Sequence, residues 1–202
     1  DAKSFFALTY PSDDVHALLR ALSKRFEAGR SEGTILAQAV KGLGKSHTLL
    51  LAYHLFNSPE EARAWTVTLG YNWKSPVDAI VLAHKFTDRA IPKDALWMLI
   101  GEKLGKSWNE KKAPGPDELL AAIGDRHLIL IFDELERGVQ GIINEARRTQ
   151  NLSFLQMLSE AANRDSRVTL VAAVYYGTVE PGATLRRTPR VELRFRKTED
   201  RA

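Results

Sequence analysis

Residues 39–46, Ala39-Val40-Lys41-Gly42-Leu43-Gly44-Lys45-Ser46, follow the apolar run 34–38 and lead into a second apolar run, 48–52. This order predicts a strand, a glycine-containing loop and a helix, which is the layout of a phosphate-binding P-loop. The two glycines allow positive φ angles, so that consecutive N–H groups can point at a polyphosphate. The helix that begins near Lys45 adds its free N–H groups and the positive end of its dipole.

We expect this loop to bind ATP, with Lys45 also acting in catalysis as a positive charge on the β- and γ-phosphates and Ser46 as a ligand of Mg²⁺. Ala39 stands where the full pattern has a glycine. Since alanine is the smallest alternative and lies at the strand end, we expect the loop to keep its phosphate-binding conformation. The alternative, a chance Gly-Lys-Ser at a helix start, fits the surrounding pattern less well. The predicted nucleotide-binding residues are Val40, Lys41, Gly42, Leu43, Gly44, Lys45, Ser46 and His47.

A second signature lies at residues 127–135, His-Leu-Ile-Leu-Ile-Phe-Asp-Glu-Leu. Five consecutive apolar residues predict a strand buried on both faces, which ends in Asp133 and Glu134. At the tip of such a strand Asp133 can hold Mg²⁺ through water, and Glu134 can polarise a water molecule for attack on the γ-phosphate. The alternative is a core strand that ends in acids only because it reaches solvent.

Composition narrows the class of protein. The 202 residues are 44% hydrophobic and 27% charged, with a formal net charge of +4, which suits one α/β domain with a sizeable core. The absence of cysteine excludes disulfides and thiolate–metal sites and fits a cytoplasmic protein. No apolar run approaches the ~20 residues of a membrane helix, so no membrane partner is expected. Histidines 16, 47, 54, 84 and 127 show no metal-ligand spacing.

The positive charge is partly local. Residues 186–202 hold seven basic residues against three acids. Such a cluster can contact DNA, but it also fits a solvated strand and tail.

Strands alternate with helices along the chain, which predicts a parallel sheet with helices on both faces and a ligand at the carboxyl ends of the strands. Residues 1–33 form an N-terminal helix segment and 34–202 the core of a single domain, with 135–150 predicted to be a charged, flexible connection. Because the sequence starts without methionine, we expect it to be part of a larger chain. The predicted strands are 34–38, 78–86, 127–133, 168–176 and 191–195; the predicted helices are 12–27, one after the P-loop, one from 58, 94–104, 117–123 and 151–163.

Further candidates lie near the predicted site. Tyr176 and Thr178, at the tip of the fourth strand, can contact the γ-phosphate or the attacking water, or can simply end the strand. Phe5, Phe6 or Tyr10 can stack on adenine, or can form an aromatic plug on the core.

The two signatures resemble those of the ASCE group of P-loop ATPases, in which the catalytic glutamate directly follows the strand aspartate and which includes the AAA+ proteins. The resemblance implies a three-layer αβα sandwich with a five-stranded parallel sheet of order 5-1-4-3-2. It also implies a homo-oligomer or partner subunits with arginine fingers that act across the interface. The candidate fingers are Arg186 and Arg187, then Arg147, Arg148 and Arg164. We expect these 202 residues to lack the helical lid of a full AAA+ module, because they end after the fifth predicted strand.

A more specific resemblance rests on residues 42–50 with 53–55, and on 151–156 with 158–162. These stretches look like the large AAA+-like ATPases of bacterial anti-phage gene clusters of the BREX type.

The sequence therefore predicts Mg²⁺-dependent ATP hydrolysis by a motor or switch domain, with an antiviral role implied by the resemblance. The alternatives are a nucleotide-gated scaffold with little hydrolysis and a DNA-associated remodelling module. A GTPase is disfavoured because guanine-specific P-loop proteins read the base with the motif Asn-Lys-x-Asp. The most similar stretch of this sequence, residues 109–112, lacks the aspartate. A nucleotide kinase would not need the Asp133-Glu134 pair.

Overall fold

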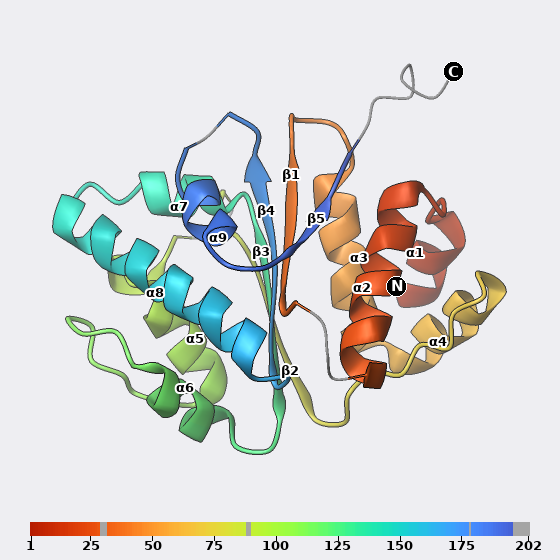
Figure 1. Ribbon diagram of the computed structural model, residues 1–202, viewed down its shortest axis with the longest axis horizontal. Coiled ribbons are helices and arrows are strands. Elements are labelled where there is room, and N and C mark those ends of the chain that lie inside the picture. Colours follow the sequence, from red (N-terminus) through yellow and green to blue (C-terminus); the bar gives the residue numbers. More distant parts are fainter. Residues whose placement is uncertain (29–31, 88–89, 178, 196–202) are drawn as a thin grey trace.

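Five strands form the centre of the molecule in the computed structural model, which describes residues 1–28, 32–87, 90–177 and 179–195 (Figure 1). All paired strands run parallel, in the order β2-β3-β4-β1-β5. The predicted fold class and sheet order are thereby confirmed. The strands are β1 (Thr34–Ala39), β2 (Ala79–Lys85), β3 (His127–Asp133), β4 (Val168–Tyr175) and β5 (Val191–Leu193).

The strand sequences explain this order. β3 and β4 are almost completely buried and lie in the interior of the sheet, as continuous apolar runs require. β2 and β5 lie at the edges and are only partly buried. Alternation along β1 sends Ile35 and Ala37 into one hydrophobic core and Leu36 into the other, so each face of the sheet has its own core.

One face is covered by the four N-terminal helices (Figure 1). Their buried side chains include Leu18, Leu22, Leu51 and Leu55, each 0% exposed. The helices are α1 (Ala2–Leu8), α2 (Asp13–Ala28), α3 (Lys45–Asn57) and α4 (Pro59–Thr68).

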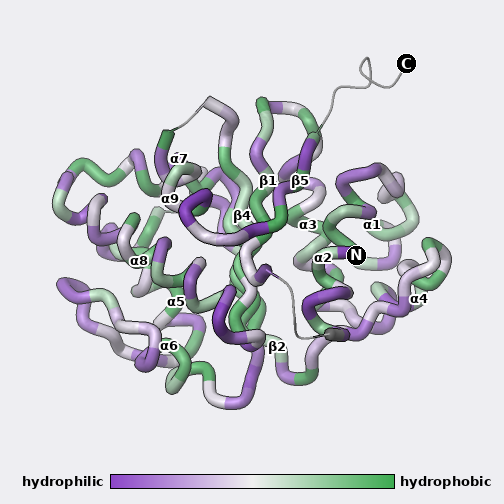
Figure 2. The backbone as a smooth tube through the Cα atoms, in the orientation of Figure 1, coloured by the Kyte–Doolittle hydropathy of each residue, from purple (hydrophilic) through white to green (hydrophobic). Residues whose placement is uncertain are grey.

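The remaining helices cover the opposite face, where Trp97, Leu158 and Leu170 are buried. Figure 2 shows that hydrophobic residues gather along the strands between the two helical layers. The elements of this face are the 3₁₀-helix η1 (Pro92–Asp94), α5 (Leu96–Leu104), α6 (Pro116–Ile123), α7 (Leu135–Gln140), α8 (Glu145–Arg164) and α9 (Gly182–Arg186). None of the helices in the described part of the chain has both the length and the apolarity that crossing a membrane demands.

The prediction of a flexible connection at 135–150 is wrong, because this segment holds α7 and the start of α8. Leu135, Val139 and Ile142 are buried, which fixes the segment on the core despite its many charges. Asn144 then caps α8 by accepting a hydrogen bond from the N–H of Arg147 at 2.9 Å.

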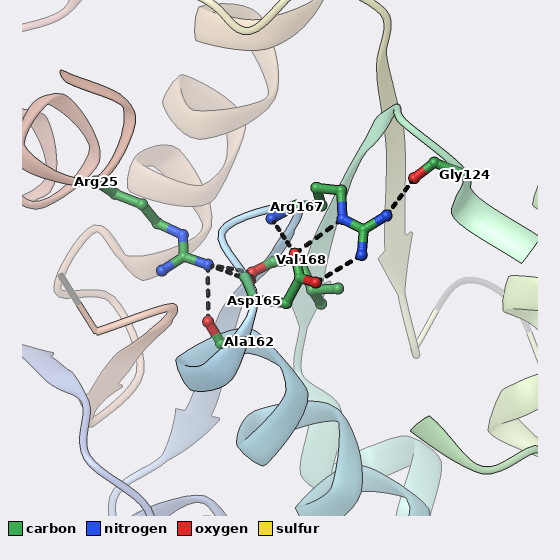
Figure 3. Close-up of polar contacts among 6 residues, drawn as sticks. All are labelled: Arg25, Gly124, Ala162, Asp165, Arg167 and Val168. Carbon is green, nitrogen blue, oxygen red and sulfur yellow. Dashed lines mark hydrogen bonds and ion pairs between the residues drawn. The ribbon is translucent and has the colours of Figure 1, made fainter. Parts of the chain in front are cut away.

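Arg25 ties the two helical layers together at the amino ends of the strands (Figure 3). It is only 3% exposed. Its guanidinium donates hydrogen bonds to Thr169 Oγ1 at 2.8 Å and to the carbonyl oxygens of Ala162 and Asp165 at 2.7 and 3.0 Å, and also to that of Val168. Burial lowers the pKa of Arg25 to about 10, so the side chain remains charged at neutral pH.

Candidate functional site

A cavity of about 800 Å³ opens at the carboxyl ends of the strands. The P-loop, the ends of β2, β3 and β4, and α7 contribute to its wall, so both sequence signatures meet in one place. Its lining residues are Lys41, Gly42, Gly44, Lys45, Ser46, His47, Lys85, Thr87, Asp133, Glu134, Glu136, Arg137, Gln140, Val174 and Tyr175.

The loop backbone has the conformation that phosphate binding requires. Gly42 and Gly44 have φ angles of 86° and 92°, which lie in the left-handed region where a side chain would be strained. Gly44 is the N-cap of α3 and supplies no side-chain cap to the first turn. The free N–H groups of that turn are therefore available to an anionic ligand.

The ammonium group of Lys45 folds back onto the loop. Its Nζ donates hydrogen bonds to the carbonyl oxygens of Ala39 at 2.7 Å and Val40 at 2.8 Å. Burial lowers the pKa of Lys45, and the nearby charges of Glu136, Asp133 and Glu134 oppose that shift. A phosphate in the cavity would replace these carbonyls as a stronger, charged acceptor.

The two acids of the second signature face the same cavity. Asp133 is 8% exposed, and its Oδ1 has no hydrogen-bond partner. Glu134 is the N-cap of α7 with φ 53°, and its Oε2 also has no partner. Carboxylate oxygens buried without a partner are costly, so their presence indicates a site shaped for a ligand that supplies the missing contacts.

Glu136 is a cavity residue that the sequence analysis missed. It is 7% exposed in the first turn of α7, and its Oε2 has no partner. Burial raises the pKa of Glu136, as does the charge of Glu134; backbone N–H bonds from Glu136 itself and Tyr175 oppose the rise, as does Lys45. Recognising a helix at 135–140 would have placed Glu136 near the site, and would have shown Arg137 there too.

Three of the predicted site residues face elsewhere. Val40, Leu43 and Tyr176 line a second hollow of about 310 Å³, together with the end of β5. Tyr176 is 64% exposed, and its N–H continues the β1–β4 ladder by donating to Ala39 at 3.1 Å. Thr178, the other candidate at this strand tip, lies outside the described residues.

The N-terminal aromatic residues divide between the core and the site. Phe6 is 3% exposed and stacks on Trp65, so it belongs to the core, whereas Tyr10 is 74% exposed. Phe5 stacks on His47 with ring centroids 4.8 Å apart, and His47 Nε2 lies 3.2 Å from Thr9 Oγ1. Since His47 also lines the cavity, these contacts tie α1 and the residue after it to the first turn of α3.

Three of the five candidate arginine fingers have partners within the chain. Arg186 donates to Gln38 Oε1 at 2.9 Å, and Arg187 lies 3.6 Å from a carboxylate oxygen of Glu180. Arg147 donates to the carbonyl oxygen of Glu110 and lies over the ring of Trp97. In the part of the chain that the structure describes, the basic residues lining the cavity are instead Lys41, Lys45, Lys85 and Arg137.

A metal would need ligands from more than the protein. Among residues 1–28, 32–87, 90–177 and 179–195, no group of three or more His, Cys, Asp or Glu could hold a metal ion. Mg²⁺ commonly uses one or two carboxylates together with substrate phosphates and water. Asp133, whose Oδ1 has no partner, and Ser46 both line the cavity and fit that pattern.

Comparison with known proteins gives one family match over part of the chain. The model described as "DUF499 N-terminal domain" matches residues 1–85, which include the P-loop and end with β2. No curated protein matches the chain.

Solved structures share the fold. The chain is similar to the ORC2 protein of Aeropyrum pernix in ADPNP and ADP complexes, with a TM-score of 0.52, 12% identity, and 94% of this chain and 50% of that chain covered. It also matches AMPPCP-bound DnaA from Aquifex aeolicus, with a TM-score of 0.42, 14% identity, and 93% and 47% covered. The chain thus spans about half the length of each of these structures. At such identity, the ORC2 similarity shows the fold alone.

Proposed function

We propose that this domain binds ATP together with Mg²⁺ and hydrolyses the bond between its β- and γ-phosphates. The observation that carries the proposal is the meeting, in one cavity, of a P-loop with its lysine and three acids, each with one buried oxygen that has no partner. The ORC2 structure that shares the fold holds the adenine nucleotides ADPNP and ADP, which supports the same ligand class here.

Each side chain has a role that follows from its place. The N–H groups of 42–46 and the ammonium of Lys45 bind the phosphates. Val40 and Leu43 contribute through their backbone, because their side chains line the second hollow. Ser46 and Asp133 would hold Mg²⁺, which when bound neutralises phosphate charge. Glu134 orients the attacking water and accepts its proton.

Two substitutions test this proposal on the isolated chain. Lys45→Ala should weaken ATP binding about a hundredfold, because a charge-assisted contact to phosphate is lost. Glu134→Gln should keep ATP binding and lower turnover about 10²- to 10⁴-fold, because the general base is lost. Binding is measured by calorimetry with ATP and GTP, and turnover by phosphate release. Lys103→Ala, an exposed change on α5, is the control. Unchanged turnover in Glu134→Gln removes that residue from the mechanism.

A nucleotide-gated scaffold is the second candidate. It is favoured by Arg147, Arg186 and Arg187, the described candidate fingers that have partners inside the chain. An arginine finger contributes about 10³–10⁵ in rate, so a domain without one can bind ATP and barely turn it over. Brisk hydrolysis by the isolated chain would exclude this candidate.

The resemblance to BREX-type ATPases supports a role for the full-length protein in anti-phage defence, as an oligomer or with partner subunits. A plaque assay that compares hosts with the wild-type protein, with the Glu134→Gln protein and with neither tests it, and equal plaque numbers with and without the wild-type protein would contradict it. The basic cluster gives less support to DNA contact, since Arg186 and Arg190 are bonded to Gln38 and Glu192. A DNA-associated module requires binding by the chain that falls steeply with salt.

A further inference from the structure

Glu136 is a third carboxylate in the cavity, beside the Asp133-Glu134 pair. It is more than nine-tenths buried, and its unpartnered Oε2 shows that the fold does not satisfy this group by itself. A glutamate in the first turn of a surface helix can remain exposed to solvent, so the helix itself does not require this burial. The neighbouring Arg137, in the same turn, is exposed.

The charge of Glu136 acts on the groups that meet the phosphates. Glu136 acts on the Lys45 ammonium together with Asp133 and Glu134, and each of these charges raises the pKa of Lys45. The charge of Glu134 in turn raises the pKa of Glu136. A metal-free triphosphate that enters this cavity therefore meets three carboxylates as well as the lysines.

We propose that Glu136 makes nucleotide binding depend on a divalent cation, as a specificity-determining residue that disfavours metal-free ATP and favours the Mg²⁺ complex. The inference rests on the proposed function. The carboxylate repels the bare triphosphate and attracts the cation that accompanies it. Both effects increase the affinity ratio between the two forms.

The size of the effect follows from Coulomb's law. Removing one unit charge from the wall of a partly buried site that holds the phosphates changes the affinity ratio by about tenfold or more after screening by salt. The substitution Glu136→Gln removes the charge and keeps an oxygen for the N–H of Tyr175. Glu136→Asp keeps the charge.

The experiment measures the dissociation constant of ATP by calorimetry, once with Mg²⁺ and once with EDTA, for the wild-type chain and each variant. The readout is the factor by which Mg²⁺ tightens binding. We expect this factor to fall about tenfold in Glu136→Gln. Glu136→Asp should keep most of it, as should the matched control Glu118→Gln, which removes an exposed acid from the first turn of α6.

An unchanged factor in Glu136→Gln overturns the inference, and so does an equal fall in Glu118→Gln. Glu136→Ala gives the same test if the glutamine variant does not fold. If neither folds while Glu136→Asp does, the charge is structural and the inference fails. Failure of the proposed function looks different, because the wild-type chain would then bind no ATP in either buffer, or Lys45→Ala would bind as tightly as wild type.

Discussion

At the amino ends of the strands, Arg25 is 3% exposed and is surrounded by acceptors, whereas at the carboxyl ends Asp133 and Glu136 are 8% and 7% exposed and each has an oxygen without a partner. Both regions remove charge from water, which is unfavourable unless hydrogen bonds replace the lost hydration. The arginine region supplies that replacement within the protein. The acidic region supplies it only in part, because each acid keeps one oxygen without a partner.

The difference separates a stabilising site from the proposed ligand site. Arg25 joins α2 to α8 and β4, so its hydrogen bonds hold the layers of the fold together. The acids of the cavity leave their contacts unmade, which costs stability in the ligand-free protein and is retained where function needs it.

The largest effect on stability is expected at the satisfied charge. Arg25→Ala should lower the free energy of unfolding by about 3–5 kcal/mol, because the Thr169 hydroxyl and several carbonyl oxygens lose their donor in a buried place. Urea unfolding monitored by circular dichroism measures it. Arg20→Ala, an exposed change on the same helix, should cost less than about 0.5 kcal/mol. A loss below about 1 kcal/mol in Arg25→Ala would mean that water replaces the guanidinium, and the contrast with the cavity would be lost.

The sequence predicted the parts of the molecule that depend on continuous patterns. The runs 35–37 and 128–132 are apolar without interruption, which indicates buried strands, and the polar residues after parallel strands lie at one edge of the sheet. This logic brought Lys45, Ser46, Asp133 and Glu134 to one cavity. The strand order came from the resemblance, because apolar runs alone do not specify which strands are neighbours.

The residues that were missed depend on the direction in which a side chain points, and a short sequence pattern does not specify that direction. Successive strand residues point to opposite sides of the sheet. Tyr175, the last residue of β4, therefore lies at the cavity, whereas Tyr176, the predicted site residue, lies in the second hollow. Glu136 was missed because the charges of 135–150 obscured the buried positions Leu135 and Val139 of α7.

An intermediate effect of opposite sign is expected at the unsatisfied charge. Glu136→Gln should raise the free energy of unfolding of the ligand-free chain by about 1 kcal/mol, because a desolvated carboxylate is replaced by a neutral amide. Since the pKa of Glu136 is raised in the folded state, its destabilising effect grows as pH rises above the ordinary value of 4.5. Urea unfolding at pH 7.5 and pH 4 measures both statements.

Saturating MgATP should reduce the gain in free energy of unfolding that Glu136→Gln brings, because the wild-type carboxylate then has a cation nearby. A glutamine variant less stable than wild type at pH 7.5 would show that the acid is satisfied after all. The cavity would then resemble the Arg25 region.

The smallest effect concerns the ion pair that borders the arginine region. Arg167 lies 2.7 Å from Asp165, whose own backbone carbonyl accepts from Arg25 (Figure 3). The hydrogen bond from the Arg167 side chain lowers the pKa of Asp165 below 3.8. Between the lowered pKa and the ordinary value of 3.8, the folded state therefore binds fewer protons than the unfolded state. The stabilisation is present above about pH 4 and is lost as pH falls through the lowered pKa.

Asp165→Asn keeps an oxygen for the N–H of Arg167 but removes the charge. It should cost about 0.5–1 kcal/mol at pH 7, since the pair is partly exposed, and less at pH 2.5, because protonation of the wild-type carboxyl then removes part of the difference in charge. Urea unfolding of both proteins at the two pH values measures the difference. A cost independent of pH would assign the contribution of Asp165 to its geometry rather than its charge. In that case the arginine region would owe its stability to hydrogen bonds to neutral acceptors, and it would contrast still more sharply with the charged cavity.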